Sequence, residues 1–160
     1  MLGSFRYILF FLLFFPHTLF SQGINDIDSL KHELISAENE EEKIDILNDI
    51  SFTFLFENID SAIFYNDLAF EAAQSIKYSI GTATSELNFA AIAETQGDYQ
   101  TAVEKFHNAL AIFQEENDTL GVIHAYSNLS LTHYYLNDSK KSLHYGELAL
   151  LESRNFGRSD

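Results

Sequence analysis

Hydrophobic residues recur at spacings of three and four along most of the chain, which is the pattern of amphipathic helices. This pattern predicts helices over residues 42–56, 60–77, 82–96, 99–116, 120–136 and 139–154. A shorter stretch, Ile24 to Ala37, carries Ile27, Leu30 and Leu34 on one helical face and predicts a lead-in helix. The only proline, Pro16, precedes all of these segments, so none of them contains a proline that would break a helix. The pattern predicts an all-α protein.

The predicted helices repeat with a period of 40 residues. Three rows of residues recur in register, namely Asn48, Asn88 and Asn128, then Ala62, Ala102 and Ser142, then Ala69, Ala109 and Ala149. Gly81 and Gly121 mark two of the joints. A fixed period of this length predicts a solenoid of stacked helix pairs. We divide it into units 42–81, 82–121 and 122–154, preceded by a lead-in helix and acidic linker (22–41) and followed by a polar tail (155–160).

The turns and the first unit refine this division. Gly97-Asp98 and Asn137-Asp138 supply residues that tolerate the left-handed conformation that ends a helix, so each predicts a tight turn between antiparallel helices. The acidic run Glu40 to Glu42 favours a solvated helix N-terminus. The first unit fits the pattern better when its first helix is shifted by one residue, so that Ile50 and Ser51 take the roles of Phe89 and Ala90 in the middle unit. This shift implies a turn one residue shorter.

The middle unit carries a family resemblance. Leu87-Asn88-Phe89-Ala90, followed by Gly97-Asp98-Tyr99 and then by Ala102, Phe106 and Ala109, resembles a tetratricopeptide repeat. The resemblance implies a right-handed α-solenoid of about three antiparallel helix pairs plus a short N-terminal helix. It also implies that small and aromatic residues pack the repeats, at Ala90, Gly97, Tyr99, Ala102, Phe106, Ala109, Ser142 and Ala149. The usual unit has about 34 residues; the longer period resembles the N-terminal regions of bacterial tetratricopeptide repeat sensor and regulator proteins.

Charge and cysteine content exclude several functions. The chain has 24 acidic and 9 basic residues, a net charge of -15. Because residues 1–21 hold only one of these charges, on Arg6, the remainder carries 8 minus 24, or -16. Such a field repels phosphate backbones, so nucleic acid is not an expected partner. The absence of cysteine excludes disulfides and thiolate metal sites.

The N-terminus has the pattern of a secretory signal peptide. Arg6 is followed by nine apolar residues, 7–15, and small Ser21 offers a cleavage position. The pattern predicts an exported protein, periplasmic or otherwise extracytoplasmic, whose residues 1–21 are cleaved after Ser21. The alternative is an uncleaved N-terminal membrane anchor, although the apolar run is shorter than the roughly 20 residues that span a bilayer.

The sequence contains no constellation typical of an enzyme. None of the six histidines forms the i, i+4 pair that would place two metal ligands on one helical face. Phosphate-binding loops, nucleophile elbows and zinc-binding helix motifs are also missing from the sequence. We therefore expect no enzymatic activity, no cofactor and no metal site.

The resemblance places a binding surface on the first helix of each pair. It implies a peptide-binding groove along the exposed faces of segments 82–96 and 120–136, with candidate residues Asn88, Glu94, His124, Ser127, Asn128, Tyr134 and Tyr135. An asparagine amide can both donate to and accept from a peptide backbone. The alternative for the asparagine row is that it bonds neighbouring helices and holds their register. Neither segment contains Lys or Arg, which favours a neutral or basic peptide over an acidic one.

Together these observations predict an exported, non-enzymatic scaffold that binds proteins or extended peptides, and that forms the sensory or interaction part of a bacterial signalling protein. The alternative is a structural module, or a fragment of a longer solenoid, with no ligand of its own. In that case we expect self-association through the C-terminal end, because residues 152–160 are too polar and too short to cap the last unit.

Overall fold

The computed structural model describes residues 27–157, and this region is helical throughout, without strands. The first helix that the structure describes comprises residues 27–36. It is followed by α3 (Glu40–Phe54), α4 (Ile59–Ile76), α5 (Ser79–Thr95), α6 (Tyr99–Glu115), α7 (Thr119–Tyr135) and α8 (Ser139–Phe156). The all-α prediction is confirmed, and every predicted helix in this range is present. No helix among these residues is long and apolar enough to cross a bilayer. The predicted signal peptide lies outside the described residues.

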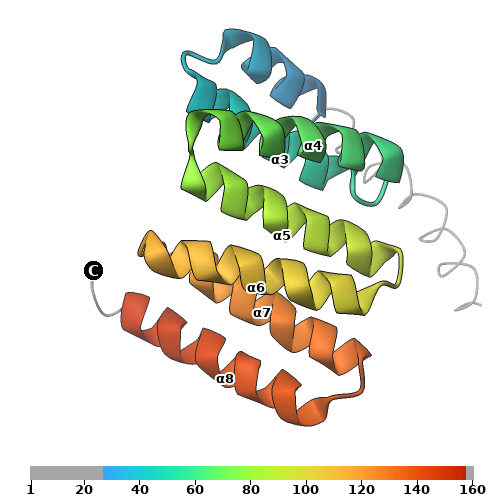
Figure 1. The fold of residues 1–160 in the computed structure, drawn as a ribbon, viewed down its shortest axis with the longest axis vertical. Helices are drawn as coiled ribbons and strands as arrows, with labels where there is room; N and C mark the ends of the chain where they lie inside the picture. The colour runs from blue at the N-terminus through green and yellow to red at the C-terminus, as the bar shows by residue number, and fades with distance from the viewer. Residues whose placement is uncertain (1–26, 158–160) are drawn as a thin grey trace, which may run out of the picture.

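The helices stack as three antiparallel pairs, α3 with α4, α5 with α6 and α7 with α8 (Figure 1). Successive pairs contact each other through α4 and α5, and then through α6 and α7. The first helices of the pairs also contact one another, α3 with α5 and α5 with α7, whereas α4, α6 and α8 make no such contacts among themselves. One side of the solenoid is therefore built from the first helices α3, α5 and α7, and the other from α4, α6 and α8.

The turns that follow α4, α5, α6 and α7 share a left-handed residue, and most of them share a capping aspartate. The helix-ending residues Lys77, Asn117 and Asn137 have φ values of 59°, 57° and 58°, and Gly97 has 78°. In three of the four turns an aspartate follows and its carboxylate accepts a backbone N–H of the next helix, at Asp98, Asp118 and Asp138. The left-handed turns predicted at Gly97-Asp98 and Asn137-Asp138 are confirmed. The Glu40 to Glu42 run begins α3 as predicted, with Asn39 as the capping residue.

Gly81 and Gly121 lie inside the first turns of α5 and α7, and not at the joints where the sequence placed them. A Cβ atom on Gly121 would lie 2.3 Å from the ring of Phe113, and one on Gly81 would lie 2.4 Å from the ring of Tyr78. These glycines therefore recur because an aromatic side chain packs directly on the helix backbone. The helix pairs consequently begin at residues 79 and 119, a few residues before the unit boundaries drawn from the sequence.

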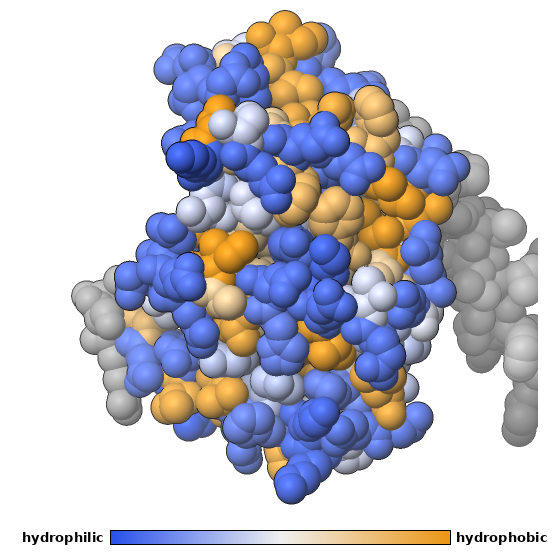
Figure 2. All heavy atoms as spheres, viewed as in Figure 1, coloured by the Kyte–Doolittle hydropathy of each residue, from blue (hydrophilic) through white to orange (hydrophobic). Residues whose placement is uncertain are grey.

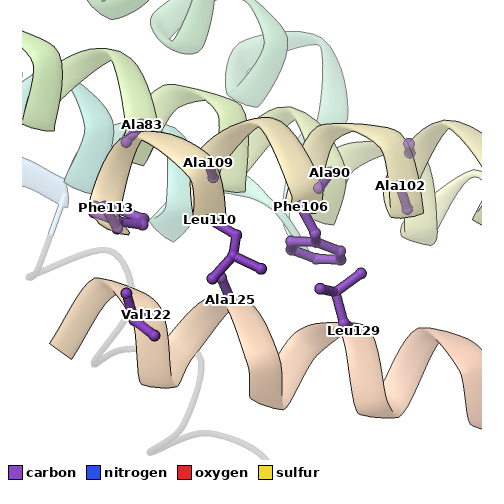
Figure 3. Close-up of a cluster of buried hydrophobic side chains, with 11 residues drawn as sticks. Ala83, Ala90, Ala102, Phe106, Ala109, Leu110, Phe113, Val122, Ala125 and Leu129 are labelled. Atoms are coloured by element: carbon purple, nitrogen blue, oxygen red, sulfur yellow. The ribbon is translucent and has the colours of Figure 1, made fainter. Parts of the chain in front are cut away.

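The core lies where α6 packs between α5 and α7. Phe106 and Leu110 of α6 point towards Ala125 and Leu129 of α7 (Figure 3). Between α5 and α6, the small residues Ala83 and Ala90 of α5 and Ala102 and Ala109 of α6 are all fully buried. Because alanine adds only one methyl group, the two helices of the pair approach closely, and the aromatic residues fill the space towards α7.

The first unit is shifted by one residue, as the sequence predicts. The Ser51 hydroxyl donates to the carbonyl of Ala62 at 2.9 Å, and the Ser130 hydroxyl donates to the carbonyl of Ser142 at 2.8 Å. These bonds join equivalent points of two helix pairs, yet they span 11 residues in the first pair and 12 in the last. The first pair is therefore closed by a connection one residue shorter.

Candidate functional site

A cleft of about 360 Å³ opens where the C-terminal ends of α3, α5 and α7 meet the start of α6. Its walls combine aliphatic, aromatic and polar side chains with a single carboxylate. They are Leu55, Phe56, Ala91, Glu94, Thr95, Tyr99, Leu131 and Tyr135. The cleft lies on the side of the solenoid built from the first helices, which is the side where the sequence predicts the groove.

Glu94 supplies the charge in this cleft. Its side chain is half-buried, and its Oε1 accepts a hydrogen bond from the Thr132 hydroxyl at 2.6 Å. Burial raises the pKa of the Glu94 carboxyl above its usual value, while the bond from Thr132 acts in the opposite direction. The ion pairs among the described residues join other groups, namely Lys43 with Glu40, Lys105 with Glu86 and Lys141 with Asp138. The charge on Glu94 is therefore not balanced by a neighbouring cation within the described region.

Aromatic rings form the rest of the wall. The rings of Tyr99 and Tyr135 stack with centroids 5.4 Å apart, and the ring of Tyr134 meets that of Tyr135 edge-on at 5.9 Å. Phe56 stands in the turn between α3 and α4 with 83% of its surface exposed. The cleft thus offers flat apolar surfaces beside a carboxylate, a combination that suits amphipathic groups with a cationic or hydrogen-bonding end.

The seven residues predicted for the groove do not share one surface. Glu94 and Tyr135 line the cleft, whereas Tyr134 lines a second groove formed with α8. The exposed residues His124 and Ser127 lie outside both grooves, and the Ser127 hydroxyl donates to the Ile123 carbonyl of its own helix.

The asparagine row is divided in the same way. Asn88 is buried and its side-chain nitrogen donates to the backbone carbonyl of Asn48 at 2.9 Å. Asn48 in turn donates to the carbonyl of Gly81 at 3.3 Å and accepts from the hydroxyl of Ser85 at 2.9 Å. These bonds join α3 to α5. At Asn48 and Asn88 they therefore agree with the alternative in which the asparagine row bonds neighbouring helices and holds their register. Asn128 is half-buried, and its side chain makes no hydrogen bond to the rest of the described region.

Three residues of the cleft lie outside segments 82–96 and 120–136, on which the sequence predicts the groove. Leu55 and Phe56 belong to the turn of the shifted first unit, where the repeat pattern gave no guidance. Tyr99 was assigned to repeat packing, and its half-buried ring does pack on α7 while also facing the cleft. One feature of the sequence could have indicated this part of the cleft: Phe56 is a large apolar residue directly before the polar turn residues Glu57 and Asn58.

The second groove, of about 410 Å³, lies along the outer face of α7 and α8. Gly146 and Leu150 of α8 line it, and they stand 40 residues after Phe106 and Leu110 of α6. In α6 those positions are covered by α7, but nothing in the described region covers α8, where Leu143 and Leu150 are 65% and 51% exposed. This groove is therefore the site that the next helix of a solenoid would occupy.

Two histidines pack with tyrosines between α6, α7 and α8. The buried ring of His133 stacks on that of Tyr145 at 5.5 Å, and the Tyr145 hydroxyl lies 3.3 Å from Nε2 of His107. Burial, with a smaller contribution from the charge of Lys141, lowers the pKa of His133 and of His107. No group of three or more potential metal ligands occurs among residues 27–157.

Comparisons with known proteins agree with this architecture. The family described as tetratricopeptide repeat matches residues 81–150. The fold is similar to the tetratricopeptide repeat domain of Arabidopsis FLU, at 21% identity and a TM-score of 0.64, over 73% of this chain and 99% of that one. It is also similar to aspartyl phosphate phosphatase F from Bacillus subtilis, at 21% identity and a TM-score of 0.72.

The second similarity covers 87% of this chain but only 38% of the phosphatase. At 21% identity, the two similarities are evidence for the fold alone. Among curated proteins, no sequence matches. The family match extends from the start of α5 into α8 and includes the residues on which the resemblance was founded. Residues 81–150 therefore match the tetratricopeptide repeat family, and the described region has the fold of a tetratricopeptide repeat solenoid.

Proposed function

We propose that this chain is a non-enzymatic scaffold that binds an extended protein segment or peptide in the cleft between α3, α5 and α7. Tetratricopeptide repeat domains generally bind proteins or peptides. The observation that carries the proposal is the cleft itself, in which exposed aromatic and aliphatic surface from three helix pairs surrounds one carboxylate. Catalysis is not part of the proposal, because the cleft pairs this carboxylate with neither a histidine nor a second acid.

The charge distribution favours a neutral or basic ligand. Neither α5 nor α7 contains Lys or Arg, so these helices offer no lysine or arginine side chain to an acidic peptide. The net charge of -15 also repels nucleic acid. An extended peptide fits because the cleft is open and crosses several helices, so that successive residues of one strand can reach different walls.

The test compares two exposed leucines of α7. Leu131 lines the cleft and is 45% exposed, whereas Leu120 lies outside it and is 51% exposed. Peptides of about twelve residues, selected for binding from a random library, should lose affinity for Leu131→Glu and keep it for Leu120→Glu. Equal binding to both variants would place the peptide elsewhere, and a library without any binder would contradict the scaffold proposal.

We further propose that the scaffold is exported and serves as the sensory or interaction part of a bacterial signalling protein. Support comes from the sequence of residues 1–21, which lie outside the described region, and from the long repeat period. N-terminal sequencing of protein recovered from the periplasm of an expression host should begin at Gln22. Recovery from the cytoplasm with residues 1–21 intact would contradict export, and recovery from the membrane fraction would favour the anchor.

The groove on α8 supports a second candidate, a structural module that associates with itself through its C-terminal end. An exposed leucine forfeits roughly 1.5 to 3 kcal/mol of burial, and Leu143, Leu150 and Leu151 are all exposed there. Sedimentation should then show association that Leu143→Glu abolishes. A single monomeric species at all concentrations would refute this candidate and leave the peptide scaffold standing.

A further inference from the structure

The cleft contains an electrostatic imbalance that the proposed function alone does not explain. Glu94 is the only charged side chain in its wall, and it is half-buried beside Leu131 and the tyrosine rings. Burying a carboxylate without a compensating cation is unfavourable, and a single bond from a neutral hydroxyl offsets only part of the loss of water. This carboxylate is therefore ready to bind a cation brought by a ligand.

The surroundings of Glu94 favour one kind of cation. The stacked rings of Tyr99 and Tyr135 present flat faces, and Phe56 adds a further exposed ring at the edge. A guanidinium group is planar, is less strongly hydrated than an ammonium, and stacks on aromatic faces while donating to a carboxylate. The aliphatic stem of an arginine side chain would meanwhile cover Leu131.

We propose that the cleft is a recognition pocket for one arginine side chain of an extended peptide, with the guanidinium on Glu94 and its plane and stem against Tyr135 and Leu131. This inference rests on the proposed function and specifies the residue that the scaffold reads. It also assigns a role to Thr132, whose hydroxyl holds Oε1 of Glu94 and thereby orients the carboxylate.

Figure 2 shows that, on the face where α4, α5, α6 and α8 are seen, the hydrophobic residues are divided into separate patches by hydrophilic ones. The buried acid of the described region, Glu86 of α5, already pairs with Lys105 of α6 at 3.1 Å. Glu94 thus differs from Glu86 in the feature that matters here, the absence of an internal cationic partner among the described residues.

The pocket is tested by nuclear magnetic resonance titration of residues 22–160 with N-acetyl-arginine methylamide, using the citrulline derivative as its neutral counterpart. We expect shifts of the backbone amides of Glu94, Leu131 and Tyr135, and binding at least about tenfold weaker for citrulline, since one charge-assisted hydrogen bond is lost. Glu94→Gln should abolish the preference for arginine. Glu104→Gln, which removes the same charge from an exposed position on α6, should leave it unchanged.

Glu94→Gln keeps the shape of the side chain, so Thr132 retains an acceptor; circular dichroism checks the fold. As a second variant, Tyr135→Leu should weaken arginine more than lysine, because only the guanidinium stacks well. Equal binding of arginine and citrulline, or an arginine preference that survives in Glu94→Gln, would overturn the pocket.

The same measurements separate this inference from the proposed function. If selected peptides bind the cleft equally well with and without arginine, the arginine pocket is wrong and the scaffold stands. If the arginine derivative binds but no selected peptide does, the cleft still recognises a guanidinium, and the proposal that its ligand is an extended peptide is wrong. A failure of both ligands would contradict both.

Discussion

The three asparagines that repeat at 40-residue intervals should differ sharply in what they contribute to stability. All three look equivalent in the sequence. In the structure, the side chain of Asn48 bonds to Gly81 and Ser85 and accepts a longer bond from Asn88, whereas the side chain of Asn88 bonds to Asn48 alone. The side chain of Asn128 has no hydrogen-bonding partner among the described residues. Replacing each by alanine in turn therefore removes a different number of contacts with the same chemical change.

The magnitudes follow from these contacts. A buried neutral hydrogen bond contributes about 0.5 to 1.5 kcal/mol net to stability. Replacing asparagine by alanine inside a helix offsets about 0.5 kcal/mol of that loss, because alanine has the higher helix propensity. Asn48→Ala also leaves the side chain of Asn88 with only its backbone acceptor, so we expect a loss of about 2 kcal/mol. Asn88→Ala should cost about 1 kcal/mol. Asn128→Ala should be neutral or slightly stabilising.

Urea unfolding followed by far-ultraviolet circular dichroism measures these differences, provided that the slope of the transition is the same for all three variants. The order Asn48, Asn88, Asn128 is the essential result. A loss for Asn128→Ala as large as that for Asn88→Ala would refute the assignment of Asn88 as the residue that holds α5 against α3. In that case all three amides would contribute through packing that is independent of their hydrogen bonds.

Three further outcomes are expected. Gly121→Ala should destabilise the chain by about 1 to 3 kcal/mol in urea unfolding, because the added Cβ atom would lie 2.3 Å from the ring of Phe113. Gly97→Asn should be nearly neutral, because Asn137 occupies the matching turn at a φ of 58°. The pKa of His133 is lowered in the native state, so the unfolded chain binds more protons and the stability of the fold should decrease as the pH falls below about 6.5. The variant His133→Phe keeps an aromatic ring on Tyr145 and should reduce this decrease between pH 7.5 and 5.5. Amide hydrogen exchange should be faster in α8 than in α6, because α8 buries only Ala149 and contacts α7 alone; equal protection would mean that the end is covered in solution.

The sequence was sufficient for the architecture because the same physical needs recur in every unit. Alanine rows mark where helices approach closely, and Gly97 and Asn137 mark the left-handed turns, so helix number, order and pairing follow from the period. Even the slip in the first unit could be predicted, since Ser51 fits the position of Ala90 better than Ile50 does. Gly81 and Gly121 were misplaced because a glycine under an aromatic ring has the same signature as a glycine in a turn.

The candidate site was less predictable. Exposure along a helix can be inferred from periodicity, but whether Asn88 faces a ligand or the carbonyl of Asn48 depends on the distance between two helices, which the sequence does not specify. Tyr134 and Tyr135 are neighbours in the chain and both are exposed, yet they line different grooves because successive residues on a helix point about 100° apart. Phe56 lies in an irregular turn, to which no periodic argument applies.

The cleft owes its position to the repeat and its chemistry to departures from the repeat. Two pairs of equivalent positions, 40 residues apart, meet there and differ in kind: Ala91 and Leu131, and Thr95 and Tyr135. Glu94 also lines the cleft, but its equivalent, Tyr134, lines the second groove. Had the repeat been perfect, two glutamates or two tyrosines would have stood at the positions of Glu94 and Tyr134. Because only one helix brings the carboxylate, the cleft has a direction, with the charge on α5 and the large apolar and aromatic side chains on α7. A directional site of this kind can fix the orientation in which a peptide strand crosses the solenoid, which neither the period nor the packing residues could do alone.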